Sequence, residues 1–174
     1  MKPSKLRILW HILFLFLMLA AHTLQNTPGL FSINGARPAL IVPFVLVVAV
    51  LKGEGVGAVY GAVGGLLWDL SSRRLPGFSA LILMVCCVAA ALLTIYFLRV
   101  IWFNITLLTA AVLFIFCSLD YLFFYAIWGY NDIHIVLLQE IIPMAVYTVM
   151  VSPVVYFLLN KINGKFPVTD NWSG

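Results

Sequence analysis

The sequence predicts an all-α integral membrane protein with about six transmembrane helices. Of the 174 residues, 64% are hydrophobic and only 9% are charged, whereas about a quarter of the residues of a soluble globular domain are charged. The apolar residues form long unbroken runs, which excludes a transmembrane β-barrel with its short alternating strands. Backbone polar groups inside lipid must be paired, so the spans are expected to be helical. We expect residues 1–174 to form a single transmembrane domain.

The first two spans are predicted at 8–24 and 39–51, since a crossing needs about 20 mostly apolar residues. A cleaved signal peptide is the alternative for the first span. Small residues should occupy the first and third positions before a cleavage site, and Leu19 and Met18 occupy the third position before the candidate cuts. We therefore expect the first span to be retained. The second span is short and contains Pro43, which leaves a tilted or re-entrant segment open.

The remaining spans are predicted at 55–70, 78–98, 102–127 and 135–159. A polar turn, Lys52-Gly53-Glu54, precedes the third span, and Arg99 ends the fourth. The segment 128–134 combines aromatic and polar residues, as expected at a membrane interface. The last span contains two prolines, at 143 and 153. Six spans place both ends of the chain on the same side of the membrane.

The distribution of basic residues predicts that this side is the cytoplasm. Positively charged residues favour cytoplasmic flanks, so the net charge of +4 indicates membrane orientation and not nucleic-acid binding. With both termini inside, the cytoplasmic basic residues are Lys2, Lys5, Arg7, Lys52, Arg99, Lys161 and Lys165. Those outside are Arg37, Arg73 and Arg74. The three cysteines all lie in apolar runs, which argues against a disulfide framework.

A glycine series in the third span is the most specific pattern of the chain. Gly53, Gly57, Gly61 and Gly65 are spaced four apart, with Gly64 beside them. Glycines at this spacing allow two membrane helices to approach backbone to backbone. The neighbour is either another span of the same chain or the single helix of a partner protein. Packing within the chain is the more common use of such a face.

A polar segment follows this helix and contains Asp69, Arg73, Arg74, Pro76 and Gly77. A carboxylate at a membrane helix end is costly without a partner. An ion pair with Arg73, one turn further on, would stabilise the turn. A polar contact site for a partner protein is the alternative. We expect Pro76 and Gly77 to end the turn and begin the next helix.

A second acid, Asp120, lies within the predicted fifth span and is a functional candidate because intramembrane acids are rare. Its candidate mates are His11, Tyr147 or a serine. Glu140 is expected at a helix start, where the helix dipole favours an acid. Clustering of Asp69, Asp120 and Glu140 in space stays open.

Enzyme chemistry has little support in the sequence. The histidines are not spaced as metal ligands, and no metalloprotease or phosphate-loop motif occurs. Ser71 and Ser72 are expected to lack the nearby base that a serine nucleophile needs. We expect a protein that is not an enzyme and that uses no cofactor or metal.

The glycine-rich segment resembles the core motif of the rod shape-determining protein MreD family. The resemblance rests on GEGVGAVYGAVGGLLWDLSS at 53–72 and LPGFSAL at 75–81. That family has a glycine-rich helix ending in a leucine–aspartate pair, a short loop and a glycine before the next span. Gly35-Ala36-Arg37-Pro38 is similar to the family's start of the second span. Two positions differ, since many members have an acid at 39 and a glycine at 73.

The resemblance implies a non-enzymatic scaffold of the cell-elongation complex in the bacterial cytoplasmic (inner) membrane. The implied partner is the single-span protein MreC, and through it the filament protein MreB, the glycosyltransferase RodA and its penicillin-binding transpeptidase. The implied role is lateral peptidoglycan synthesis and rod cell shape. In architecture the family is similar to the substrate-binding subunits of energy-coupling-factor transporters. A small-molecule, vitamin-type binding subunit of a transporter is therefore the alternative function, and it predicts a polar cavity with Asp120 as a candidate.

Overall fold

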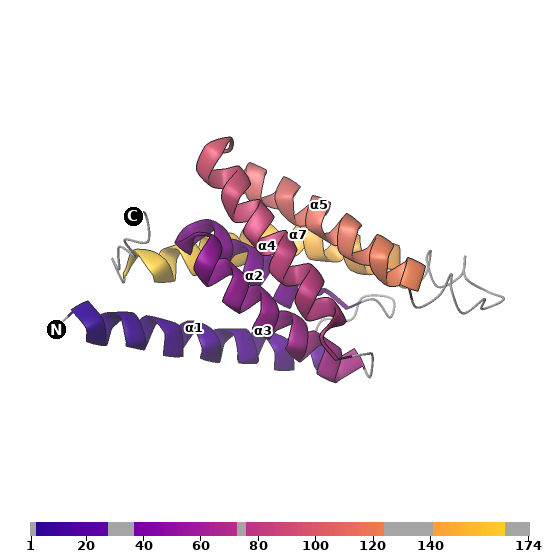
Figure 1. The fold of residues 1–174 in the computed structure, drawn as a ribbon, viewed down its shortest axis with the longest axis horizontal. Coiled ribbons are helices and arrows are strands. Elements are labelled where there is room, and N and C mark those ends of the chain that lie inside the picture. Colours follow the sequence, from indigo (N-terminus) through magenta and orange to yellow (C-terminus); the bar gives the residue numbers. More distant parts are fainter. Residues whose placement is uncertain (1–2, 28–36, 73–75, 124–140, 166–174) are drawn as a thin grey trace.

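The computed structural model describes residues 3–27, 37–72, 76–123 and 141–165. These residues form helices joined by short turns, and none of them is in a β-strand. The prediction of an all-α fold is therefore confirmed. The helices are α1 (Pro3–Asn26), α2 (Ile41–Lys52), α3 (Glu54–Ser72), α4 (Phe78–Tyr96), α5 (Trp102–Tyr121) and α7 (Ile142–Gly164), as Figure 1 shows.

Four helices are long and apolar enough to cross a membrane: α1 from Leu6 onward, α4, α5 and α7. In each of these four helices, at most half of the apolar stretch is buried inside the protein. Their outer faces carry large apolar side chains, among them Phe16, Leu81, Phe114 and Met150. Such faces are suited to contact with lipid tails, which are as apolar as these side chains.

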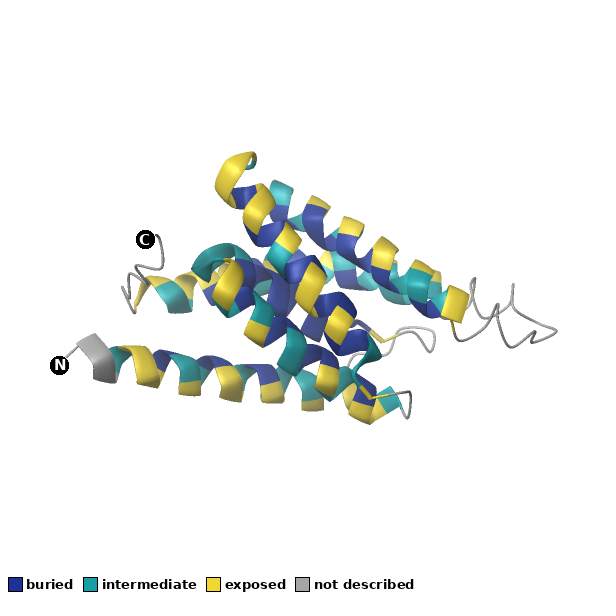
Figure 2. Cartoon of the chain, viewed as in Figure 1, coloured by how far each residue is buried: buried dark blue, intermediate teal, exposed yellow. Residues whose placement is uncertain are grey.

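The short helix α2 forms the centre of the bundle (Figure 2). Every residue from Ile41 to Ala49 is buried, and α2 contacts α1, α3, α4, α5 and α7. Its 12 residues span about 18 Å, well below the hydrocarbon thickness of about 30 Å. A helix that is hydrophobic on all sides is buried on all sides. The segment 39–51 was too short in the sequence to be assigned as a span or as a re-entrant segment. In the structure, its helix is an interior helix surrounded by protein.

Several helix ends differ from the predicted limits for local physical reasons. After Tyr96, the N–H groups of Phe97 and Leu98 both donate to the Leu93 carbonyl and end α4. The helix α7 continues past the predicted end at 159 through Lys161 to Gly164, because a helix can extend beyond the apolar layer into the polar region. The predicted ends at 127 and 135 lie outside the described residues.

The two ends of the bundle carry different connections (Figure 1). The start of α1, the end of α7, the α2–α3 turn and the α4–α5 turn share one end, which we call the terminal end. The α3–α4 turn lies at the other end, which we call the distal end. A hydrogen bond of 3.1 Å from the Trp10 indole N–H to the Asn163 side-chain oxygen joins α1 to α7 at the terminal end. The described basic residues of this end are Lys5, Arg7, Lys52, Arg99, Lys161 and Lys165.

Candidate functional site: the glycine-rich helix, its aspartate and a basic cavity

The glycines of α3 lie where α4 crosses it at backbone contact. A Cβ added to Gly61 would lie 2.9 Å from the Leu83 carbonyl oxygen and 3.0 Å from the Met84 Cα. A Cβ added to Gly65 would collide with the backbone of Ala80. The two helices therefore approach as closely as their backbones allow, which is what small residues permit in membranes.

Two further glycines of α3 receive side chains of the central helix. A Cβ at Gly57 would lie 2.6 Å from the Ala49 Cβ, and one at Gly64 would lie 2.6 Å from a Val45 methyl group. The glycine face of α3 is thus filled by α2 and α4 of the same chain. A partner helix has no access to this face unless one of these two helices moves away.

Gly53 has a different role from the other members of the series. It lies before the first residue of α3, its φ is +90°, and a Cβ there would meet nothing within 4 Å. Its N–H donates to the Ala49 carbonyl at 2.8 Å and ends α2. A positive φ favours glycine because it has no Cβ. Gly53 is therefore a turn residue between α2 and α3.

Asp69 binds the start of the next helix. Its carboxylate accepts the backbone N–H of Gly77 at 2.8 Å and that of Ser79 at 3.2 Å, and the residue is only 2% exposed. Gly77 has a φ of +101° and offers no side-chain cap, so the aspartate of α3 caps α4 in its place. N-terminal N–H groups lack partners within their own helix, and the helix dipole favours an anion there. The predicted ion pair with Arg73 and the role of Arg74 lie outside the described residues.

Asp120 lies near the end of α5 and is 7% exposed. It belongs to the distal end, as do the Trp68–Phe116 ring pair at 5.7 Å and the Phe78–Phe123 pair at 5.2 Å. His11 lies near the terminal end, where its Nδ1 is 3.3 Å from the Tyr60 hydroxyl. The expectation that His11 could pair with Asp120 is therefore wrong, because the two occupy opposite ends of the bundle.

The prediction for Ser71 also needs correction. The structure brings His22 of α1 beside it, with Nε2 3.0 Å from the hydroxyl oxygen, so a base does lie within hydrogen-bond distance. The Ser71 hydroxyl donates to the Leu67 carbonyl at 2.8 Å. This bond directs its proton away from the imidazole. The pair therefore connects α1 to α3 and lacks the proton geometry of an activated nucleophile.

Glu140 lies outside the described residues, so its place relative to the two aspartates is not described. Among the residues that the structure does describe, no three His, Cys, Asp or Glu side chains gather as metal ligands do.

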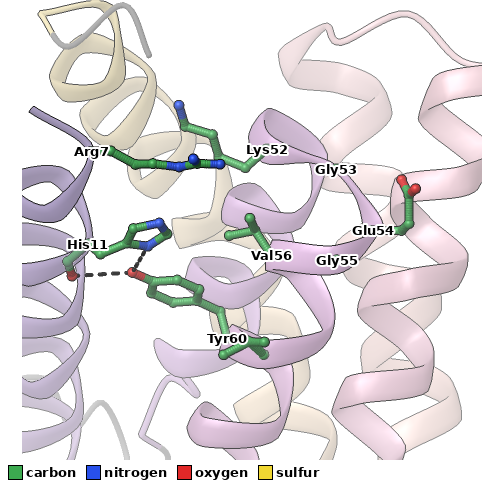
Figure 3. Close-up of a pocket in the computed structure, with 9 residues that line it drawn as sticks. Arg7, His11, Lys52, Gly53, Glu54, Gly55, Val56 and Tyr60 are labelled. Carbon is green, nitrogen blue, oxygen red and sulfur yellow. Dashed lines mark hydrogen bonds between the residues drawn. The ribbon is translucent and has the colours of Figure 1, made fainter. Parts of the chain in front are cut away.

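Sequence reasoning missed a basic cavity of about 510 Å³ at the terminal end (Figure 3). It lies between α1, the end of α2 and the first turns of α3. Its polar and charged side chains are those of Arg7, His11, Lys52, Glu54 and Tyr60. Lys52 also lies over the Trp10 ring, 4.7 Å from its centroid. The sequence indicates these basic residues only as markers of orientation, because the approach of Arg7 to Lys52 depends on how α1 packs against the end of α2.

Together, the fold and these contacts define a multi-pass helical membrane protein built around a buried short helix and a glycine-packed helix pair. The family model of the rod shape-determining protein MreD matches residues 4–162, nearly the whole chain. The chain belongs to this family, which makes it a multi-pass inner-membrane protein with a role in determining rod cell shape. No curated protein and no solved structure matches the chain. The similarity to the substrate-binding subunits of energy-coupling-factor transporters stays a prediction.

Proposed function

We propose that this protein is a non-enzymatic scaffold of the cell-elongation complex that binds MreC and supports lateral peptidoglycan synthesis. Through MreC it would connect indirectly to MreB, to RodA and to the penicillin-binding transpeptidase of RodA. The observation that carries the proposal is the family match over 4–162. The alternative, a vitamin-type transport subunit, gains no support from Asp120, since the basic cavity lies at the opposite end of the bundle.

The packing of α3 limits where a partner helix can bind. Since α2 and α4 already fill the glycine face, a single-span partner would pack on an outward face of the bundle. Ala89 of α4 and Ala111 of α5 are exposed small residues on such faces. Small residues permit close helix approach in membranes. We therefore expect MreC to contact the outer surface of α4 or α5.

The orientation proposed for this scaffold has both termini in the cytoplasm. Among the described basic residues, six lie at the terminal end (Lys5, Arg7, Lys52, Arg99, Lys161 and Lys165), whereas Arg37 lies at the distal end. Positive residues favour the cytoplasmic side, so the terminal end would face the cytoplasm. Labelling of single cysteines at Arg99 and Arg37 in intact cells, in a background without the native cysteines, tests this orientation.

Co-expression with the MreC of the same genome tests the scaffold proposal. We expect the two proteins to co-purify in detergent as a defined complex, and photo-crosslinkers at Ala89 or Ala111 to capture MreC. A crosslinker at Val154, which is 64% exposed on α7, is the matched control on another outward face. A chain that is folded and monodisperse alone but forms no complex would overturn the proposal and favour the ligand-binding alternative. A complex crosslinked only through Val154 would overturn the assignment of the α4–α5 surface.

A further inference from the structure

The basic cavity has charged groups on one side and leads on its other side toward apolar residues of α1 and α3. Figure 3 shows the Arg7 and Lys52 side chains close together above the imidazole of His11. Glu54 is the acidic residue among those that line the cavity, and its side chain points away from the two cations in the same view. A guanidinium and an ammonium that line the same cavity favour an anionic group over a neutral one in that space.

An apolar furrow continues from this cavity along α1 and α3. It has a volume of about 260 Å³ and is lined by His11, Ile12, Leu15, Val59, Tyr60 and Val63. His11, Val59 and Tyr60 line both spaces, so the two are contiguous. The Tyr60 hydroxyl donates to the His11 carbonyl at 3.3 Å, and this bond holds α1 to α3 where the basic cavity meets the furrow.

The order of residues along α1 matches the division between the basic cavity and the apolar furrow. Arg7 is the second residue of the candidate span Leu6–Asn26, so we expect its guanidinium at the level of the lipid headgroups. Ile12 and Leu15 follow within the span, and they are 59% and 44% exposed. We therefore expect the furrow to open to the hydrocarbon side of the membrane, with its charged end at the interface.

From these features we propose that the cavity and furrow bind one anionic glycerophospholipid. Its phosphate lies at Arg7 and Lys52, and one acyl chain lies along the furrow between α1 and α3. A guanidinium presents paired N–H donors that match phosphate oxygens, and an ammonium adds a compact charge. Basic pockets between membrane helices are known to take such headgroups. A soluble phosphate would use the cations but not the furrow, so the apolar extension favours a lipid.

Native mass spectrometry of the purified chain in detergent provides the test. The protein is titrated with phosphatidylglycerol and, in parallel, with phosphatidylcholine as the uncharged counterpart. We expect one phosphatidylglycerol to be retained in preference. Arg7→Gln and Lys52→Gln should each weaken its binding about 5-fold, the equivalent of about 1 kcal/mol for each basic residue near an anionic lipid. Arg7→Lys, which keeps the charge, should bind more tightly than Arg7→Gln.

Matched variants separate this site from general attraction to lipid. Arg99→Gln and Lys161→Gln remove cations of the same end that do not line the cavity, and both should retain binding. Val59→Trp should block the junction of cavity and furrow, whereas Val154→Trp changes a similarly exposed valine on α7 and should not.

Three results would overturn the inference. The first is equal loss of binding in the cavity and control variants, which would indicate diffuse electrostatic attraction. The second is equal retention of the two lipids. The third is displacement of the bound lipid by glycerol phosphate at matched concentration, which would assign the site to a soluble phosphate compound. Circular dichroism of each variant identifies any that has not folded, and Arg7→Lys keeps the test decisive if a glutamine variant fails to fold.

Discussion

The Asp69 carboxylate, near the end of α3, accepts the backbone N–H of Ser79 in the first turn of α4 at 3.2 Å. The acid that the sequence placed at a helix end thus caps the helix that follows. This contact holds the α3–α4 turn closed at the distal end, beside the place where Gly65 meets Ala80 at backbone distance. The cap and the glycine contact stabilise the same helix pair.

Replacing Asp69 should destabilise the protein without changing its surface. Asp69→Ala removes the acceptor for two backbone N–H groups, one of them buried. We expect a loss of about 1–3 kcal/mol, since a buried unpaired donor costs about this much. The loss is measured as a lower thermal unfolding midpoint in detergent. Asp69→Asn, which keeps one acceptor oxygen, should lose less.

Glu54→Gln serves as the control for this prediction. It changes an exposed acid in the first turn of α3 and should leave the midpoint nearly unchanged. An Asp69→Ala protein that unfolds at the wild-type temperature would show that the cap contributes nothing to stability.

Alanine should be tolerated at Gly55 and rejected at Gly65. A Cβ at Gly65 collides with the Ala80 backbone, which cannot move away without separating α3 from α4, whereas a Cβ at Gly55 meets nothing within 4 Å. We expect Gly65→Ala to lower the yield of monodisperse protein in size-exclusion chromatography. Gly55→Ala should be neutral or stabilising by up to about 1 kcal/mol, because alanine is the better helix former.

The same pair of variants tests how the glycine face is used. If Gly65→Ala left a well-folded protein that only failed to bind MreC, the face would serve a partner helix and the observed packing would not describe its use.

Thr148 should be required for the position of the central helix. The backbone N–H of Ala39, just before α2, donates to the Thr148 hydroxyl of α7 at 2.9 Å, and Thr148 is fully buried. Thr148→Val keeps the shape but leaves this N–H unpaired, so we expect a loss of about 1–3 kcal/mol. Chemical unfolding of the purified protein measures it.

Thr106→Val is the matched control, because the Thr106 hydroxyl bonds only to the Trp102 carbonyl of its own helix. Equal stability losses in the two variants would mean that the contact between α7 and the start of α2 contributes no more to the free energy of unfolding than a hydrogen bond within one helix.

The bond between Trp10 and Asn163 should couple α1 to α7. Asn163→Ala removes the acceptor of the indole N–H, and we expect a loss of about 1 kcal/mol, typical of one hydrogen bond. A double-mutant cycle with Trp10→Phe measures the coupling energy. Asn160→Ala, an exposed asparagine on the same helix, is the control. A coupling energy of zero would contradict the contact.

The sequence by itself determined that this is a helical membrane protein and which segment carries its family motif. Both follow from local composition, since long apolar runs must become helices in lipid and glycines four apart lie on adjoining turns. The starts of α3 and α4 followed from the same runs, because Lys52-Gly53-Glu54 and Pro76-Gly77 interrupt them.

Only the tertiary structure decided what each feature touches. The partner of Asp69 is eight to ten residues away along the chain, and the glycine face could equally have met another protein. The burial of α2 depends on the helices around it, and its own apolar sequence has no face that points to a particular neighbour. The meeting of Arg7 and Lys52 depends on how α1 packs against the end of α2. Contacts between distant segments come from packing, which local sequence does not encode.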